Sequence, residues 1–253
     1  MFTHERHRLI ARLLARHQRM TVRAIGEQLA ISPATLRRDL VKMEAQGHLV
    51  RVHGGVVHPG ELRGEPSFSL KSRKAVEAKR AIAAAAAGEV PEGASVFLDS
   101  GTTCLEVGRR LLARGDLRLI TNSVPLLHEA AAAGVAVLAT GGELRPISGA
   151  LTGPLGEEWL RRFSIDRAFL GASGLTPEGP TTTELSEAAI KERIMERAAL
   201  SVLVADASKW GASAPIRFGA WDGFSRWITS DDLPEAVAAS WRHGTEIVRV
   251  APG

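Results

Sequence analysis

The sequence contains a single cysteine, no tyrosine and few aromatic residues, which are 5% of its 253 residues. Because a disulfide needs two thiols, Cys104 cannot form one within the chain, and we interpret it as a small buried hydrophobe. His4 and His7 lie three residues apart without further ligands near them in the sequence, so we expect no metal site. We expect no other cofactor either.

Long apolar runs are also missing. A helix that crosses a bilayer needs about 20 apolar residues, and no segment approaches that length. The basic N-terminus lacks an apolar secretory core followed by a small-residue cleavage site. The sequence therefore predicts a protein that makes no membrane contact and resides in the cytoplasm.

Charge of one sign is concentrated at the start of the chain. Residues 1–80 hold 16 Lys and Arg against 7 Asp and Glu, whereas residues 81–253 hold 16 against 21. A local cationic surplus favours phosphate backbones through counterion release. By itself it would indicate an ordinary solvated surface, but here it coincides with a sequence motif.

That motif lies in residues 31–55 and predicts a helix followed by a two-stranded hairpin. Ser32 is a good N-cap, and Pro33 suits the first helical position, where no backbone N–H is needed. One buried face repeats every three to four residues and comprises Leu36, Leu40 and Met43. Gly47 provides a left-handed stop, and Gly54 with Gly55 can take the positive φ angles of a hairpin turn.

Two further helices complete the module. A short helix over residues 22–29, capped by Thr21, is separated from Ser32 only by Ala30 and Ile31, which is helix-turn-helix spacing. An amphipathic helix over residues 4–19 closes a small core. Residues 1–58 are therefore predicted to form a winged helix-turn-helix.

The side chains expected at DNA are short, polar or cationic. Arginine can read guanine with two hydrogen bonds, and wing residues contact the backbone or the minor groove. The expected DNA-binding residues are Thr21, Ser32, Pro33, Ala34, Thr35, Arg37, Arg38, Lys42, Arg51 and His53. Because one module covers few base pairs, a specific double-stranded operator requires at least a homodimer.

After this module the composition and the pattern of apolar residues change. Residues 59–70 are rich in proline, glycine and charge and are predicted to be a linker, and a helix is expected over residues 72–89. Residues 71–253 then alternate short β-rich runs with amphipathic helices, which predicts an α/β domain with a parallel sheet. The expected strands are residues 95–98, 118–121, 135–139, 167–171, 201–205, 227–229 and 246–250, and the expected helices are 103–113, 125–133, 155–162, 184–197 and 234–243.

Small and hydroxyl-bearing residues follow these strands, where parallel sheets bind ligands. The clearest loop runs from Asp99 through Ser100, Gly101 and Thr102 to Thr103 and opens a helix, whose free N–H groups and positive dipole end suit a phosphate. A plain strand-to-helix turn explains such a loop equally well. At another strand end, Lys209 can contact a phosphate and Asp206 can accept hydrogen bonds from sugar hydroxyls. A single lysine or aspartate in such a loop is, however, more typical of a loop cap or a surface ion pair.

Glu187 and Lys191 lie four residues apart on a predicted helix. That spacing can stabilise the helix as an ion pair, and it can equally place both side chains at a ligand.

With these motifs, the chain resembles the DeoR family of bacterial transcriptional regulators over nearly its whole length. Residues 31–55 match the DNA-binding signature, and residues 97–111, 119–131 and 184–211 match the sensor domain. The resemblance implies a sensor similar to ribose-5-phosphate isomerase and CoA-transferase folds, a phosphorylated sugar or related metabolite as effector, and a repressive role. The ligand-binding positions that it implies are Asp99, Ser100, Gly101, Thr102, Thr103, Thr121, Asn122, Gly141, Gly142, Glu187, Lys191, Asp206 and Lys209. We add Thr182 and Thr183, because their segment departs from the family pattern and can determine which sugar is bound.

We therefore expect a ligand-controlled repressor of a carbohydrate operon rather than an enzyme. The alternative is a sugar-phosphate isomerase with a DNA-binding arm, whose proton transfer needs a carboxylate beside the substrate carbons. Residues 171–174 contain no carboxylate where the isomerases of this fold carry theirs, which leaves Glu187 as the possible base. An architectural DNA-binding protein that ignores metabolites is a third possibility.

Overall fold

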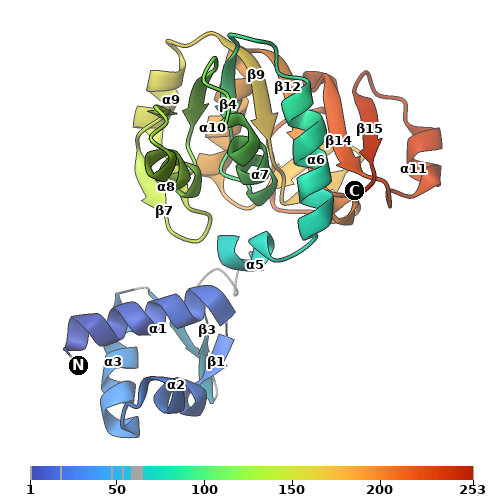
Figure 1. Ribbon diagram of the computed structural model, residues 1–253. Helices are drawn as coiled ribbons and strands as arrows, with labels where there is room; N and C mark the ends of the chain where they lie inside the picture. The colour runs from blue at the N-terminus through green and yellow to red at the C-terminus, as the bar shows by residue number, and fades with distance from the viewer. Residues whose placement is uncertain (1, 18, 47, 53, 58–64, 253) are drawn as a thin grey trace. The chain divides into compact units, whose positions relative to one another are not determined.

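The structure, a computed structural model, describes residues 2–17, 19–46, 48–52, 54–57 and 65–252 (Figure 1). The chain divides into two compact units, Met1–Lys74 and Ala75–Gly253. Within the described ranges, each helix is too short or too polar to cross a membrane.

The first unit packs helices against a small antiparallel sheet. Its elements are α1 Thr3–His17, α2 Val22–Leu29, α3 Pro33–Ala45, α5 Phe68–Ser72, β1 Arg19–Thr21, β2 Val50–Val52 and β3 Gly55–Val57, and the strand order is β1-β3-β2. The three apolar residues predicted for the buried face of α3 are 0–1% exposed and share one core with Ile10, Leu14 and Ile25. The predicted winged helix-turn-helix is thus confirmed.

Two details of that prediction were wrong. The first helix ends at His17 rather than at residue 19, because Arg19 pairs with Val57 and adds a strand to the wing. Of the two hairpin glycines, Gly54 has a φ of +79°, whereas Gly55 lies in β3. A Cβ on Gly55 would meet the carbonyl oxygen of Met20 at 2.6 Å, so close strand approach is the reason for that glycine.

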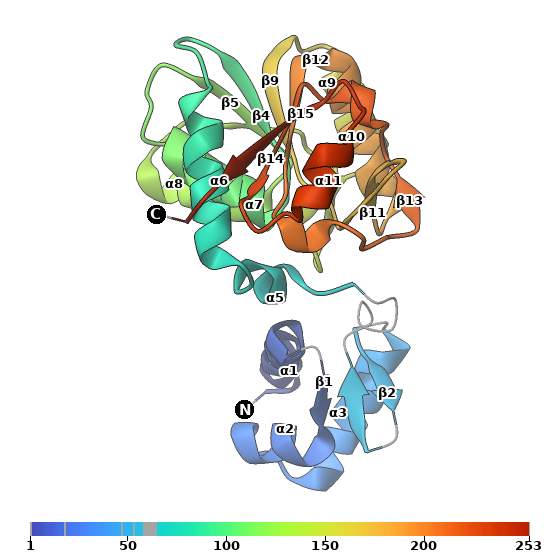
Figure 2. The same cartoon turned by 90° about the vertical axis from the view of Figure 1, so that its right-hand side faces the viewer.

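The second unit is built on a seven-stranded sheet in which every pairing is parallel, as the sequence predicts. In sheet order its strands are β15 Glu246–Val250, β14 Arg226–Ser230, β12 Ala198–Val204, β9 Ile165–Leu170, β4 Ser95–Leu98, β5 Arg118–Thr121 and β6 Leu138–Ala139. Its helices are α6 Val76–Gly88, α7 Thr102–Leu111, α8 Val124–Ala133, α9 Pro154–Leu160, α10 Leu185–Arg197 and α11 Glu235–Ser240. Figure 2 shows α6, α7 and α8 on one face of the sheet and α9 and α10 on the other.

Short antiparallel strands supplement this sheet and were not predicted. They form the hairpin β7 Glu143–Arg145 and β8 Ala150–Thr152, and a small sheet of β10 Gly174–Thr176, β11 Gly179–Thr182 and β13 Ile216–Arg217. The segment rich in proline and threonine after residue 174 is therefore a hairpin. Strands of two to four residues are too short to show an alternating pattern in the sequence.

The helix predicted over residues 72–89 also differs. The chain forms α5 first, so the last three residues of the predicted linker are helical, and α6 starts only at Val76. Ala75, the N-cap residue of α6, interrupts the run with a φ of +48°, a left-handed conformation that a continuous right-handed helix does not contain.

Candidate functional sites

The start of α3 presents the polar surface expected to face DNA. The Ser32 hydroxyl accepts a hydrogen bond from the Thr35 backbone N–H at 3.4 Å and donates one to the Thr35 hydroxyl at 3.0 Å, which confirms Ser32 as the N-cap. Pro33, Ala34, Arg37, Arg38 and Lys42 are exposed. Because the opposite side of α3 is buried, these exposed side chains are the ones available to contact DNA.

Asp39 connects this helix to α1 and was not identified from the sequence. It is 3% exposed and accepts hydrogen bonds from the Arg6 guanidinium at 2.7 and 3.1 Å, and its Oδ1 lies 3.2 Å from His7 Nε2. Burial acts to raise the pKa of Asp39, but the bonds from Arg6 and His7 outweigh it and hold that pKa below its usual value. An acidic residue between two apolar positions of a helix is the signal that could have revealed this contact.

Two of the remaining predicted DNA residues, Thr21 and Arg51, have partners inside the unit. The Thr21 hydroxyl accepts from the Ala24 N–H at 3.1 Å and so caps α2. Arg51 is tied to Glu44 of α3, through its backbone N–H at 2.9 Å and its guanidinium at 3.1 Å. His53 and Gly47 lie outside the described residues.

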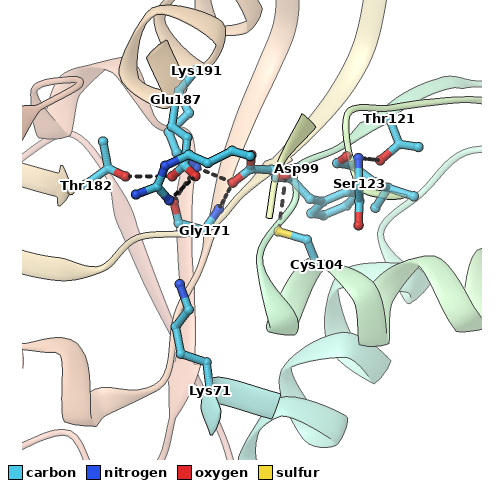
Figure 3. Close-up of polar contacts among 12 residues, drawn as sticks. Lys71, Asp99, Cys104, Thr121, Ser123, Gly171, Thr182, Glu187 and Lys191 are labelled. Carbon is cyan, nitrogen blue, oxygen red and sulfur yellow. Dashed lines mark hydrogen bonds and ion pairs between the residues drawn. The ribbon is translucent and has the colours of Figure 1, made fainter. Parts of the chain in front are cut away.

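In the second unit, a buried ion pair joins α10 to the carboxyl end of β4. The ammonium of Lys191 contacts Asp99 and also donates to the Gly171 carbonyl at 3.1 Å, and Asp99 accepts from the Gly171 N–H at 3.1 Å (Figure 3). Burial acts to lower the pKa of Lys191, but Asp99 and Glu187 outweigh it and raise that pKa above its usual value. Three residues far apart in the sequence therefore meet where β4 and β9 end.

A second charged pair joins Glu187 of α10 to Arg145 of β7, a residue that was not predicted from the sequence. Glu187 accepts hydrogen bonds from Arg145 of β7 at 3.0 Å and from the Thr182 hydroxyl at 3.2 Å. Glu187 and Lys191 thus bond to other elements and bring β7, β11 and β4 together. Arg145 follows two glycines by three residues, but the hairpin that turns it toward α10 has no recognisable sequence signal.

Next to these pairs, the loop after β4 leads into α7, and no side chain in the described part of the protein caps the first turn of this helix. Gly101 is the N-cap residue, and a Cβ there would lie 3.6 Å from the Cα of Gly171. Ser100 and Thr103 are buried, while Thr102 is partly exposed. The backbone N–H groups at such a helix start can bind an anion.

Other predicted ligand residues have a structural explanation. The Thr121 hydroxyl donates to the Leu98 carbonyl at 2.5 Å and accepts from the Ser123 N–H at 3.0 Å, which locks the ends of β4 and β5 together. Gly142 has a φ of +107°, and a Cβ there would meet the Thr152 carbonyl at 2.3 Å. These two positions are explained without a ligand.

The rest lie along the same sheet edge or beside it. Gly141, with a φ of +73°, follows β6, and Asp206 follows β12 and caps the short helix Ala207–Lys209 by accepting from the Ser208 N–H at 3.2 Å. Four buried side-chain atoms find no hydrogen-bond partner among the described residues, and two of them, Asn122 Oδ1 and Thr183 Oγ1, belong to predicted ligand residues. Unpaired buried oxygens are unusual, and a bound ligand or water commonly supplies the missing partner.

Cys104 is fully buried beneath this loop, as predicted. Its thiol faces the Phe169 carbonyl at 3.5 Å, and burial, followed by the charge of Asp99, raises its pKa. A thiol held in its neutral form is a poor nucleophile.

Comparisons with known proteins agree with this two-part architecture. A DeoR-like helix-turn-helix domain matches residues 6–61, and a DeoR C terminal sensor domain matches residues 74–231. The chain is 38% identical over 234 residues to the HTH-type transcriptional regulator GlpR of Haloferax volcanii, covering 92% of each. It is 30% identical over 217 residues to the glycerol-3-phosphate regulon repressor of Escherichia coli (strain K12), covering 85% of this chain and 86% of the repressor.

Distant solved structures match the chain over about half of its length. Ribose 5-phosphate isomerase A from Methanocaldococcus jannaschii is 18% identical with a TM-score of 0.39, and covers 52% of this chain and 53% of its own. The Pyrococcus horikoshii OT3 translation initiation factor eIF-2B is 19% identical with a TM-score of 0.42, and covers 56% of this chain and 50% of its own.

Proposed function

Because this chain belongs to the DeoR family of transcriptional regulators, we propose that a phosphorylated sugar or a related metabolite binds in its second unit and controls binding of its first unit to an operator. The observation that carries the proposal is the uncapped start of α7 beside the Lys191–Asp99 and Arg145–Glu187 pairs. The helix start supplies N–H donors for a phosphate, and the charged side chains can bind the hydroxyls of a sugar.

The proposed DNA-binding residues contact either base edges, which differ with the sequence, or phosphates, which do not. Arg37 and Arg38, exposed early in α3, contact base edges in the major groove, and Lys42 and the wing contact phosphates. We propose that two copies bind paired half-sites, since one module reads few base pairs. Substitution Arg37→Ala is expected to weaken specific operator binding by about 1–3 kcal/mol and to leave effector binding unchanged.

The pocket residues have distinct proposed roles. Gly101, Thr102 and Thr103 bind the phosphate, with Ser100 and Lys209 at its margin, and Asp99, Glu187 and Asp206 accept from hydroxyls. Thr182, Thr183, Asn122 and Gly141 shape the remaining wall. To these predicted residues we add Arg145, whose guanidinium already holds one anion, the Glu187 carboxylate, at 3.0 Å.

The proposal is tested by measuring operator affinity at fixed salt with and without phosphorylated metabolites. Glycerol 3-phosphate belongs in that set because a relative is named for its regulon, and each compound is paired with its unphosphorylated form. A true effector at ~100 times its Kd adds ~2.7 kcal/mol to the stability of the folded state, which a thermal-shift assay detects. If every phosphorylated compound leaves both readouts unchanged, the proposal fails.

Two variants locate the pocket. Thr102→Val removes one hydroxyl with little change of shape, and Lys209→Ala removes one cation; both are expected to keep DNA affinity and to lose the effector response. Arg118→Ala is the matched control, because Arg118 is exposed at the amino end of β5, opposite to the proposed pocket. An intact response in both variants would contradict the phosphate site.

An isomerase activity has less support in the geometry. Glu187 accepts a hydrogen bond on each carboxylate oxygen, from Arg145 and from Thr182, so both oxygens already have partners inside the unit. We expect no turnover of pentose or hexose phosphates. Turnover that Glu187→Gln abolishes would reverse this conclusion.

A further inference from the structure

The outer side of α1 carries three arginines at a regular spacing. Arg8, Arg12 and Arg16 follow one another every four residues, so they lie on one side of the helix, and all three are exposed. Among the described residues, their guanidinium groups make no hydrogen bond or ion pair, whereas Arg23 of α2 pairs with Glu27 at 2.7 Å. The position of Arg16 in the last turn lets it complement the helix dipole, but Arg8 and Arg12 have no such role. We name these three residues the arginine stripe.

The arginine stripe faces away from the surface proposed to read the operator. Arg12 is two residues from both Ile10 and Leu14, which belong to the core, so it projects about 200° around the helix from them. On the core side, α1 contacts α3 through the bond from Arg6 to Asp39. Figures 1 and 2 both show α1 on the opposite side of the first unit from the turn that leads from α2 into α3. The stripe and the start of α3 therefore present cations in different directions.

The chemistry of this side of α1 favours phosphates over a protein partner. No large apolar side chain within α1 is exposed among its described residues, whereas the centre of a protein interface is apolar and depleted in charge. Arginine binds a phosphate through two parallel hydrogen bonds. The arginine stripe spans about 12 Å of helix, and a DNA duplex presents about seven phosphates over that length. The backbone of a duplex therefore offers each of the three guanidinium groups an anion.

We propose that the arginine stripe binds the phosphate backbone of a second DNA segment, so that the first unit joins two segments, one on α3 and one on α1. This inference rests on the proposed operator binding by α3, because DNA held there brings its own flanking sequence close at a high effective concentration. Since phosphate contacts carry no sequence information, the second segment needs no operator. The consequence is a regulator that draws neighbouring DNA against its operator complex.

Capture of a second duplex by the full-length protein tests this inference. An operator duplex is selected from a random-sequence library by repeated binding, immobilised and saturated with protein, and a labelled duplex without an operator is then added at fixed salt. The glutamine variant carries Arg8→Gln, Arg12→Gln and Arg16→Gln, and the lysine variant, the matched control, carries lysine at the same positions. Arginine, lysine and glutamine have similar helix propensities, so both variants preserve α1, which circular dichroism verifies.

The two variants are expected to differ in capture and to agree in operator binding. The glutamine variant should capture the second duplex roughly tenfold more weakly than the wild type, with a salt dependence that is flatter by about 2.7 in logarithmic slope, because three phosphate contacts are lost. The lysine variant keeps the charge and should capture it nearly as well as the wild type. Both should bind the operator duplex within about threefold of the wild type, since exposed charges far from the bound DNA are largely screened.

Other outcomes separate this inference from the proposed function. If the wild type binds its operator but captures no second duplex, the inference fails and operator binding stands. If the glutamine variant captures DNA as the wild type does, another surface holds the second duplex, such as the α3 of another copy, and the inference is overturned. The same result is expected if the arginine stripe binds an acidic protein instead of DNA. A wild-type protein that selects no duplex from the library would overturn both proposals.

Discussion

At the scale of single residues, the two units differ in where they bury charge. In the first unit the buried carboxylate of Asp39 fixes α3 to α1. In the second unit the pair of Asp99 and Lys191 is buried where a ligand is proposed to bind. Removing one member of a buried pair leaves the other without its compensating charge, and that penalty exceeds the net value of the pair.

Lys191→Met is therefore expected to lower the free energy of unfolding of the second unit by about 3–5 kcal/mol. The double substitution Lys191→Met with Asp99→Asn is expected to recover part of that loss, because no charge is then left unpaired. Urea unfolding of both variants and of Asp99→Asn alone gives the coupling energy. Additive losses in the double variant would contradict a direct ion pair.

For Asp39 the expected effect depends on pH. Because its pKa is lower in the folded protein than in the unfolded chain, its stabilising contribution is present above the unfolded pKa, about 4. That contribution is lost as the pH falls through the lower, folded pKa. Asp39→Asn is expected to cost about 2 kcal/mol at neutral pH and to remove this part of the acid sensitivity. An unchanged stability difference between pH 7 and pH 2 would argue against it.

At the scale of elements, the turn between α2 and α3 contains a residue in an unfavourable conformation. Ala30 is the C-cap of α2 with a φ of +52°, a left-handed conformation that glycine adopts more easily. Its N–H still bonds back to the carbonyls of Gly26 and Glu27. The tight spacing of the two helices depends on this one residue.

Ala30→Gly is accordingly expected to raise the free energy of unfolding of the first unit by about 0.5–1 kcal/mol. Ala34→Gly is the matched control, because Ala34 lies in the first turn of α3, where glycine is expected to cost up to about 1 kcal/mol. Thermal unfolding of the two variants should therefore shift in opposite directions. A shift in the same direction would show that the left-handed turn carries no strain.

The elements that the sequence predicted well are those that carry a strong local pattern. Ser32 and Pro33 marked the start of α3 correctly, and the buried apolar run of residues 95–98 marked β4. The elements that it missed depend on pairing with another strand and carry no strong local pattern of their own. Arg19 becomes a strand only through Val57, and β7 forms only against β8.

The candidate site shows the same division. The loop from Asp99 to Thr103 could be found because a strand, a glycine and a helix start follow one another in the sequence. Arg145 could not, since its contact with Glu187 spans 42 residues and depends on the unpredicted hairpin. Conversely, the hydroxyl of Thr121 has the right chemistry for a ligand but bonds inside the fold.

At the scale of the whole molecule, the unequal charge of its parts leads to a prediction about salt. Residues 1–80 carry a surplus of cations, and residues 81–253 a surplus of anions. If a bound dimer contacts about six phosphates, a fourfold rise in salt is expected to lower DNA affinity by roughly 10³. Effector binding in the second unit, involving one small anion, is expected to change far less. Titrations of both ligands across a salt series check this, and equal slopes would contradict the assignment of DNA binding to the first unit.

The strand β7 carries one further consequence. Its last residue, Arg145, reaches Glu187 inside the proposed pocket. A metabolite that takes Arg145 from Glu187 binds only the fraction of molecules in which that pair is open, so its apparent affinity is reduced by that fraction. The strength of this ion pair would thus set the metabolite concentration to which the sensor responds, so that a substitution in the pair retunes the response without changing any residue proposed to bind the phosphate.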